Sequence, residues 1–176
     1  MKQSKFILLG AALAAFLSVS AQEQPVDYVN PFVGTTNYGT TNPGAVLPQG
    51  MMSATPFNVM GSDLNKFDKD KQWWSTPYDV TNKYLTGFSH VNLSGVGCPD
   101  LGSLLLMPTT GELNVNYRQY GSEYTDEEAI PGYYRNKLSK YNVQCEMTAT
   151  LHTSRARFTF PAGQSNILLN LGEGLT

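Results

Sequence analysis

Charged residues are scarce in this chain of 176 residues. Only 15% of the residues are Asp, Glu, Lys or Arg, and the formal net charge at pH 7 is −2. Without an excess of Lys and Arg, the chain has no basic surface that would attract nucleic acid or an anionic membrane. We therefore expect neither as a partner.

The chain also has only two cysteines, Cys98 and Cys145. Whether they bridge depends on the approach of their Cα atoms, which the sequence does not show. A disulfide and two free thiols both remain open, and the small number of cysteines favours free thiols, since unpaired cysteine behaves as a small buried apolar residue.

Residues with metal-ligand spacing are lacking. His90 and His152 have no i, i+4 relation, so they form no zinc signature. Asp63, Asn65 and Asp68 do not have the spacing of a calcium loop with its central Gly and terminal Glu. No metal ligand is predicted in this chain.

No hydrophobic run is long enough to cross a membrane. The longest apolar run, residues 6–16, follows Lys2 and Lys5 and precedes the small residues of segment 18–21. This order is typical of a secretory signal peptide, here residues 1–21, with cleavage after Ala21. We expect a secreted or periplasmic protein whose mature part, residues 22–176, is one domain.

No catalytic pair stands out among the 14 Asp and Glu residues. Glu127, Glu128, Asp68 and Asp70 lie in polar runs, where solvated surface charges are expected. No Ser-His-Asp arrangement can be assigned either, because such partners are recognised by geometry. No catalytic residue is predicted.

Aromatic and turn-forming residues, in contrast, are plentiful, with ten Tyr, eight Phe, sixteen Gly and ten Pro. Apolar residues alternate with polar ones over residues 143–151 and 156–160, which indicates strands with one buried face. Further strands are expected at 101–107, 133–138 and, more fully buried, 167–171. Short strands separated by Gly/Pro turns favour an all-β fold, an antiparallel β-sandwich.

Other segments are expected to be irregular or to connect strands. Residues 30–60 should form turns between very short strands, and residues 61–79 a surface excursion with one helical turn. The turn at 108–111 should return the chain through Leu113, Val115 and Tyr117 as a hairpin. Glu127 and Glu128 should lie in a loop.

The most informative segment is the glycine-rich stretch 87–108, GFSHVNLSGVGCPDLGSLLLMP. Glycine loses the most conformational entropy on folding, so such a loop implies a close approach of its backbone to a strand or to a ligand. His90 could contact a ligand or be a satisfied structural histidine, and Asp100 could contact a ligand or cap the loop.

Trp73 and Trp74 offer flat apolar faces with a polar N–H, which suit the C–H faces of a sugar ring. Neighbours in a chain point in different directions, so one indole could be displayed while the other is buried. Burial of both in the core is an equal alternative.

Four segments, 28–35 (YVNPFVGT), 42–51 (NPGAVLPQGM), 87–111 and 131–161, together resemble the N-terminal part of glycoside hydrolase family 92, the secreted calcium-dependent exo-α-mannosidases. The third segment is the most specific. Two positions depart from the family pattern: Gln49 replaces an aromatic residue, and Leu151–Thr153 replaces a stretch that usually contains arginine.

The resemblance implies an N-terminal β-sandwich packed on a C-terminal (α/α)6 barrel, which lies outside these 176 residues. It implies inversion at the anomeric carbon, with the acid, the base and a Ca²⁺ ion supplied by the barrel. It also implies that the β-sandwich forms one wall of the pocket for a mannose-containing glycan. On that basis the expected substrate-binding residues are His90, Cys98, Asp100 and Trp74.

The C-terminal residues 172–176 directly follow an apolar strand, so we expect this chain to be an N-terminal portion of a longer enzyme, inactive by itself. The alternative is a stand-alone secreted carbohydrate-binding module that uses its Trp residues as a platform.

Overall fold

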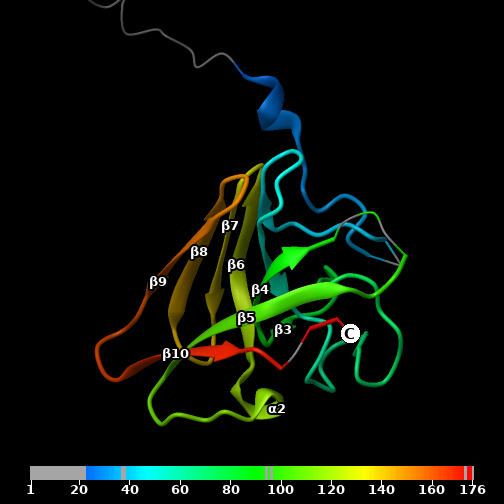
Figure 1. The fold of residues 1–176 in the computed structure, drawn as a ribbon. Helices are drawn as coiled ribbons and strands as arrows, with labels where there is room; N and C mark the ends of the chain where they lie inside the picture. The colour runs from blue at the N-terminus through cyan, green and yellow to red at the C-terminus, as the bar shows by residue number, and fades with distance from the viewer. Residues whose placement is uncertain (1–22, 37–38, 94, 96, 173, 176) are drawn as a thin grey trace, which may run out of the picture.

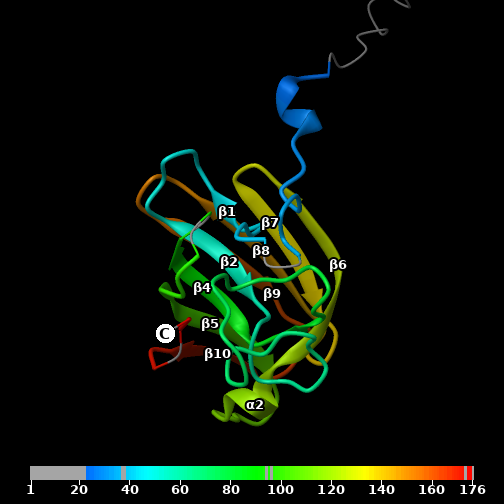
Figure 2. The same cartoon turned by 90° about the vertical axis from the view of Figure 1, so that its right-hand side faces the viewer.

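A computed structural model describes residues 23–36, 39–93, 95, 97–172 and 174–175. The predicted signal peptide, residues 1–21, lies outside the described residues. Within the described part the fold consists of two five-stranded antiparallel sheets packed as a sandwich (Figures 1 and 2). No helix of the described part is long and apolar enough to cross a membrane.

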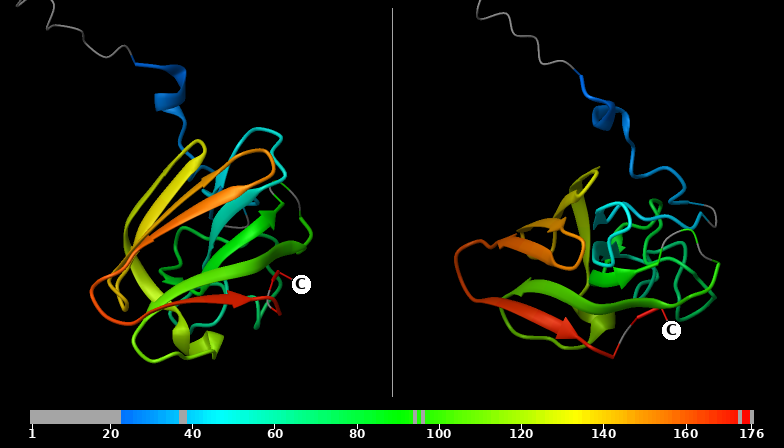
Figure 3. Two further views of the ribbon diagram at one scale, coloured as in Figure 1. Left: turned by 60° about the vertical axis from the view of Figure 1, so that its left-hand side comes forward. Right: turned by 45° about the horizontal axis from the view of Figure 1, so that its top comes forward.

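The first sheet has the strand order β1-β2-β4-β5-β10. Its longest strand, β5, lies between β4 and β10, so two segments far apart in the sequence meet on its two sides (Figure 3). The strands of this sheet are β1 (Ala45–Val46), β2 (Ser53–Phe57), β4 (Gly87–Asn92), β5 (Leu101–Thr110) and β10 (Ser165–Asn170).

The second sheet has the order β3-β6-β7-β8-β9 and is a meander from β6 onward. Two short helices complete the fold, the 3-10 helix η1 (Pro25–Tyr28) and the single turn α2 (Tyr117–Tyr120), which Asn116 caps by accepting the N–H of Arg118 at 3.1 Å. The strands are β3 (Tyr84–Leu85), β6 (Ser122–Ile130), β7 (Tyr133–Leu138), β8 (Val143–Ala149) and β9 (Ser154–Thr159).

The main core lies between the two sheets and follows the predicted alternation. In β8 every second residue is buried, and all four side chains of that set belong to one apolar cluster. Cys145 is one of them; burial raises the pKa of its thiol, and both it and the exposed Cys98 are free. The structure confirms the all-β sandwich and the alternating strands. The two thiols are free as expected, but only Cys145 has the expected burial.

Three expectations about the strands are wrong. Residues 113–117 do not form a hairpin with β5; they lead into α2, and β5 pairs with β4 and β10 instead. Glu127 and Glu128 lie within strand β6 rather than in a loop. Strand β10 is not fully buried, because Ile167 and Leu169 are exposed.

The segment 61–79 is not a surface excursion and contains no helix. Phe67 and Trp74 are buried in a second apolar cluster together with Phe57 and Leu105. This segment therefore packs on the first sheet, with Trp74 buried against it and Trp73 exposed.

Two buried asparagines hold the segment in place. Asn82 accepts the N–H of Lys66 at 2.7 Å and donates to the carbonyls of Asn58 and Phe67 at 2.9 and 3.0 Å. Asn65 donates to the carbonyl of Asn58 at 2.7 Å. A buried irregular backbone needs such partners, because an unpaired buried amide or carbonyl group is costly.

Candidate functional site

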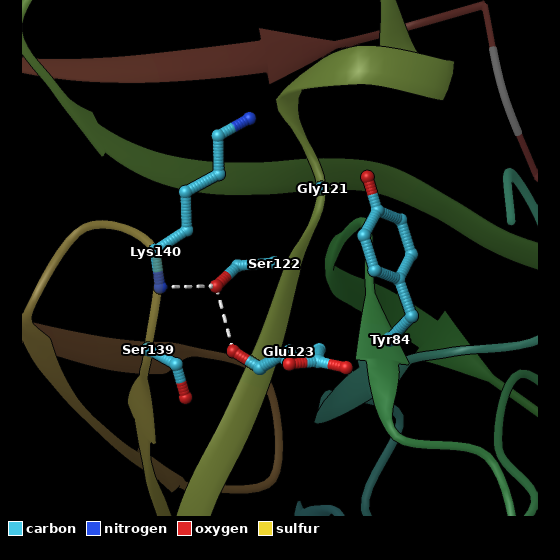
Figure 4. Close-up of a pocket in the computed structure, with 6 residues that line it drawn as sticks. All are labelled: Tyr84, Gly121, Ser122, Glu123, Ser139 and Lys140. Atoms are coloured by element: carbon cyan, nitrogen blue, oxygen red, sulfur yellow. Dashed lines mark hydrogen bonds between the residues drawn. The ribbon is translucent and has the colours of Figure 1, made fainter. Parts of the chain in front are cut away.

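A cavity of about 420 Å³ lies where β3 meets β6 (Figure 4). The Ser122 hydroxyl accepts the backbone N–H of Lys140 at 3.1 Å and donates to the carbonyl of Glu123 at 2.6 Å. Of the six lining residues only Glu123 carries a carboxylate, so this cavity cannot supply the two carboxyl groups that glycoside hydrolysis requires.

A smaller pocket of about 220 Å³ joins three segments that sequence analysis considered separately. Its lining comes from the loop before β1, from the segment 61–79 and from the glycine-rich segment between β4 and β5. The lining residues are Gly39, Thr40, Trp73, Trp74, Ser75 and Gly97. The tertiary structure thus brings the tryptophan pair and the glycine-rich segment together.

Hydrogen bonds connect the loop before β1 to the other two segments that line this pocket. The N–H of Gly95 donates to the carbonyl of Thr40 at 2.6 Å, and the Thr76 hydroxyl donates to the carbonyl of Thr41 at 3.4 Å. Sequence analysis missed Gly39 and Thr40. They lie between two of the recognised segments, and no local pattern marks them.

The two tryptophans have different environments. Trp74 is 3% exposed and stacks on Phe67 with a centroid separation of 4.0 Å and an interplanar angle of 19°. Trp73 is 54% exposed. One indole is therefore buried and the other displayed, as the sequence allowed, but the displayed one is Trp73. The contact between Trp74 and a ligand remains a prediction, and its support is that Trp74 is one of the residues that line the 220 Å³ pocket.

His90 has a structural partner inside the first sheet. Strand β4 pairs Phe88 with Leu106 and His90 with Ser103, so β5 carries one extra residue, and Leu104 there has φ 58°. The Nδ1–H of His90 donates to the carbonyl of Leu104 at 2.9 Å. His90 is buried and does not line the pocket. Its hydrogen bond instead stabilises the bulge at Leu104 of β5.

Cys98 and Asp100 lie on the glycine-rich segment directly after Gly97. Both are exposed. One carboxylate oxygen of Asp100 accepts the backbone N–H of Leu101 at 2.8 Å, so the carboxylate caps the start of β5. The other oxygen has no hydrogen-bond partner within the described residues, which leaves it available to a ligand.

Other acidic residues proved less exposed than expected. Asp68 is buried, and its carboxylate accepts the N–H of Asp70 at 3.0 Å. Glu127 accepts the hydroxyls of Tyr78 at 2.9 Å and Tyr134 at 2.8 Å, and burial raises the pKa of both tyrosines. Asp68 and Glu127 therefore act as structural acceptors, whereas Asp70 and Glu128 are exposed, as expected.

The described residues contain no group of three or more His, Cys, Asp or Glu side chains that could hold a metal ion. The exposed groups near this pocket are the indole of Trp73 and the backbone of Gly97, which line it, and the carboxylate of Asp100, which lies three residues after Gly97 and does not line it.

Comparison with known proteins places the chain in a family. The model of the glycosyl hydrolase family 92 N-terminal domain matches residues 28–176. A protein of Arthroderma benhamiae described as an uncharacterized secreted glycosidase is 33% identical over 143 residues, which cover 76% of this chain and 17% of that protein.

Two solved structures agree. A family 92 α-mannosidase from Bacteroides thetaiotaomicron, in complex with mannoimidazole, is 37% identical with a TM-score of 0.69 over 80% of this chain and 19% of that chain. A family 92 glycosyl hydrolase called ccman5 is 27% identical with a TM-score of 0.71 over 86% of this chain and 21% of that chain. This chain spans about a fifth of the length of these relatives. Because the family model matches nearly all of the described residues, the chain belongs to glycoside hydrolase family 92 and corresponds to its N-terminal domain.

Proposed function

We propose that this chain is the N-terminal part of an inverting exo-α-mannosidase that acts on mannose-containing glycans with α-1,2 linkages. The support is the 37% identity to an α-mannosidase whose structure holds mannoimidazole. The low net charge of −2 also suits a neutral glycan better than a charged polymer.

The observation that carries this proposal is the 220 Å³ pocket between Trp73 and the glycine-rich segment. The exposed face of Trp73 would pack on the C–H face of a sugar, and the free oxygen of Asp100 would accept a sugar hydroxyl. Cys98 lies on the same segment, and Trp74 holds the indole pair in place through its stack on Phe67.

In this proposal the residues of this chain bind and orient the glycan and do not move the protons. The acid and the base would belong to the (α/α)6 barrel, with the carboxyl separation that an inverting enzyme needs to admit water. The barrel would also hold Ca²⁺, a hard cation that binds hydroxyl and carboxylate oxygens.

An activity assay of the 176-residue chain on α-1,2-mannobiose with Ca²⁺ tests whether the catalytic acid and base lie outside this chain. We expect no turnover above the uncatalysed rate, since the catalytic pair lies elsewhere. Clear turnover that depends on this chain would overturn the proposal.

A second candidate function is a stand-alone carbohydrate-binding module, which the exposed indole of Trp73 favours. Affinity electrophoresis in a mannan gel tests whether this chain binds a glycan by itself, as a module must. A retarded wild-type chain, with retardation lost in Trp73→Ala but kept in the control Leu64→Ala, would support the module. Leu64 is exposed on the same segment.

We further propose export through the signal peptide at residues 1–21. A relative is described as secreted, which supports this localisation. N-terminal sequencing of the protein recovered from periplasm and medium should begin at Gln22; a mature chain that begins at Met1 in the cytoplasm would contradict it.

A further inference from the structure

A pocket of about 250 Å³ lies on the second sheet, over strands β7, β8 and β9, which lie side by side in Figure 3. It shares no lining residue with the pocket at Trp73. Apart from Met147, which belongs to the main core, its lining side chains alternate with residues that pack inward, so they stand on the outer face of the sheet. The lining residues are Tyr133, Glu146, Met147, Thr148, Arg155 and Arg157.

The strand register arranges the outer side chains of this sheet in rows. One row consists of Glu128, Arg135, Glu146 and Arg157, each paired with the next across the strands. Arg135 forms an ion pair with Glu128. The guanidinium of Arg157 donates to both carboxylate oxygens of Glu146, each at 2.6 Å. The charges of this row therefore cancel within the row.

The adjacent row contains a cation but no acid. It consists of Ile130, Tyr133, Thr148 and Arg155. Arg155 is exposed, and within the described residues its guanidinium has neither an ion pair nor a hydrogen bond. Glu146 lies diagonally across from it, but both oxygens of Glu146 already accept hydrogen bonds, one of them also from the hydroxyl of Tyr133 at 2.8 Å. The N–H donors of Arg155 are therefore available to a ligand in the pocket.

The pocket carries an excess of one positive charge, because Arg155 and Arg157 face the single carboxylate of Glu146. Hydrogen bonds from Arg157 and Tyr133 lower the pKa of Glu146, so this carboxylate is ionised at neutral pH. A ligand with one carboxylate balances the excess charge. A phosphate monoester, with a charge of about −1.5 to −2 at pH 7, would bring further negative charge toward Glu146. The site therefore favours a carboxylate over a phosphate.

We propose that this pocket binds a sugar that bears a single carboxylate, a sugar of the uronic acid class. The planar guanidinium of Arg155 pairs with the carboxylate through two parallel hydrogen bonds, and the ring of Tyr133 packs on the C–H face of the same sugar. The Thr148 hydroxyl donates to the carbonyl of Gly132 at 3.0 Å and keeps lone pairs for a sugar hydroxyl.

The size of the pocket agrees with one sugar residue. Its volume of about 250 Å³ is below the roughly 300–1,000 Å³ of pockets that hold drug-sized ligands. This inference goes beyond the proposed mannosidase function and does not rest on it, because it concerns binding of an acidic sugar on another sheet and no hydrolysis.

An NMR titration of the backbone amides of the 176-residue chain with glucuronate tests the site. We expect saturable shifts at residues 133, 146–148 and 155–157, and binding at least about tenfold tighter than that of neutral glucose. Acetate that binds as tightly as glucuronate would reveal an anion site without sugar recognition and overturn the proposal. Tighter binding of glucose-6-phosphate, or shifts confined to other residues, would overturn it as well.

Two matched variants locate the cation that binds the carboxylate. Arg155→Gln should weaken glucuronate binding at least about tenfold, whereas Arg135→Gln, which makes the same change in net charge on the same sheet outside the pocket, should not. Since Arg155 is exposed, its loss should leave the urea midpoint unchanged, which separates lost binding from lost folding. Arg155→Lys should restore only part of the affinity, because an ammonium group lacks the planar fork. Undiminished binding by Arg155→Gln, or an equal loss in both Gln variants, would overturn the proposal.

Discussion

Two irregular segments border the same pocket, and they are built in opposite ways. Residues 61–79 carry no regular secondary structure, yet Phe67 and Trp74 are buried and asparagine side chains bind the backbone. The described residues between β4 and β5 are mostly exposed, and a Cβ added at Gly95 or Gly97 would meet nothing within 4 Å.

The segment 61–79 is therefore part of the scaffold, whereas the segment between β4 and β5 is part of the exposed surface. The first segment gains its order from buried apolar area and from hydrogen bonds that replace a helix or a ladder. The second is attached mainly by the bond from Gly95 to Thr40 and by the Asp100 cap. Ligand contacts are therefore expected to come from the second segment and from the one exposed indole that the first presents.

The largest expected effect comes from removing the buried indole. Trp74→Ala should lower the free energy of unfolding by about 4 kcal/mol, because it leaves a cavity against Phe67. Urea unfolding of this variant and of Trp73→Ala, which should lose less than about 0.5 kcal/mol, checks the comparison. Equal losses would contradict the division between a buried and a displayed indole.

Removing a buried amide should come next. Asn82→Ala leaves the N–H of Lys66 and the carbonyl of Phe67 without this partner and removes one of the two side-chain donors to the carbonyl of Asn58, which should cost about 3 kcal/mol. Proteolysis should then begin within residues 61–79. The exposed Asn114→Ala is the control, and cleavage at the same site in the control would argue against this role of Asn82.

A smaller loss is expected at the bulge of β5. His90→Ala removes the donor to the carbonyl of Leu104 and should cost about 1–2 kcal/mol. If His90 instead contacts the glycan, a stability-neutral His90→Gln would abolish mannan binding. Equilibrium unfolding and affinity electrophoresis of both variants separate the two roles.

The smallest effect is expected at the exposed thiol. Cys98→Ser should change stability by less than about 0.5 kcal/mol and remove the fast phase of labelling by an aromatic disulfide reagent. Cys145 should react only after unfolding, since it is buried and burial raises the pKa of its thiol. Two fast-reacting thiols in the native wild type would contradict this assignment.

A strand could be predicted from the sequence where its buried and exposed residues alternate without interruption. In β8 one buried face runs unbroken from Val143 to Ala149, so the period of two is visible in the sequence. In β6 the register shifts around Asp126, which has φ 53°, and the buried set changes from Ser122 and Tyr124 to Ala129. A bulge reverses the phase of the pattern, so this strand was mistaken for a loop.

The candidate site, too, could be predicted only in part from the sequence. The tryptophan pair and the glycine-rich segment were recognisable by residue type, whereas the loop that joins them, Gly39 and Thr40, was not. The choice between Trp73 and Trp74 was also beyond the sequence, because it depends on which indole meets Phe67.

The sequence alone determined the all-β class, the alternating strands, the scarcity of charge and the family resemblance, because these depend on residue type and short-range order. Only the tertiary structure decided that 61–79 packs on the first sheet, that His90 holds a bulge and that Arg155 lines a pocket without an acidic partner among the described residues. These features arise from contacts between residues far apart in the chain, and local periodicity carries no information about such contacts.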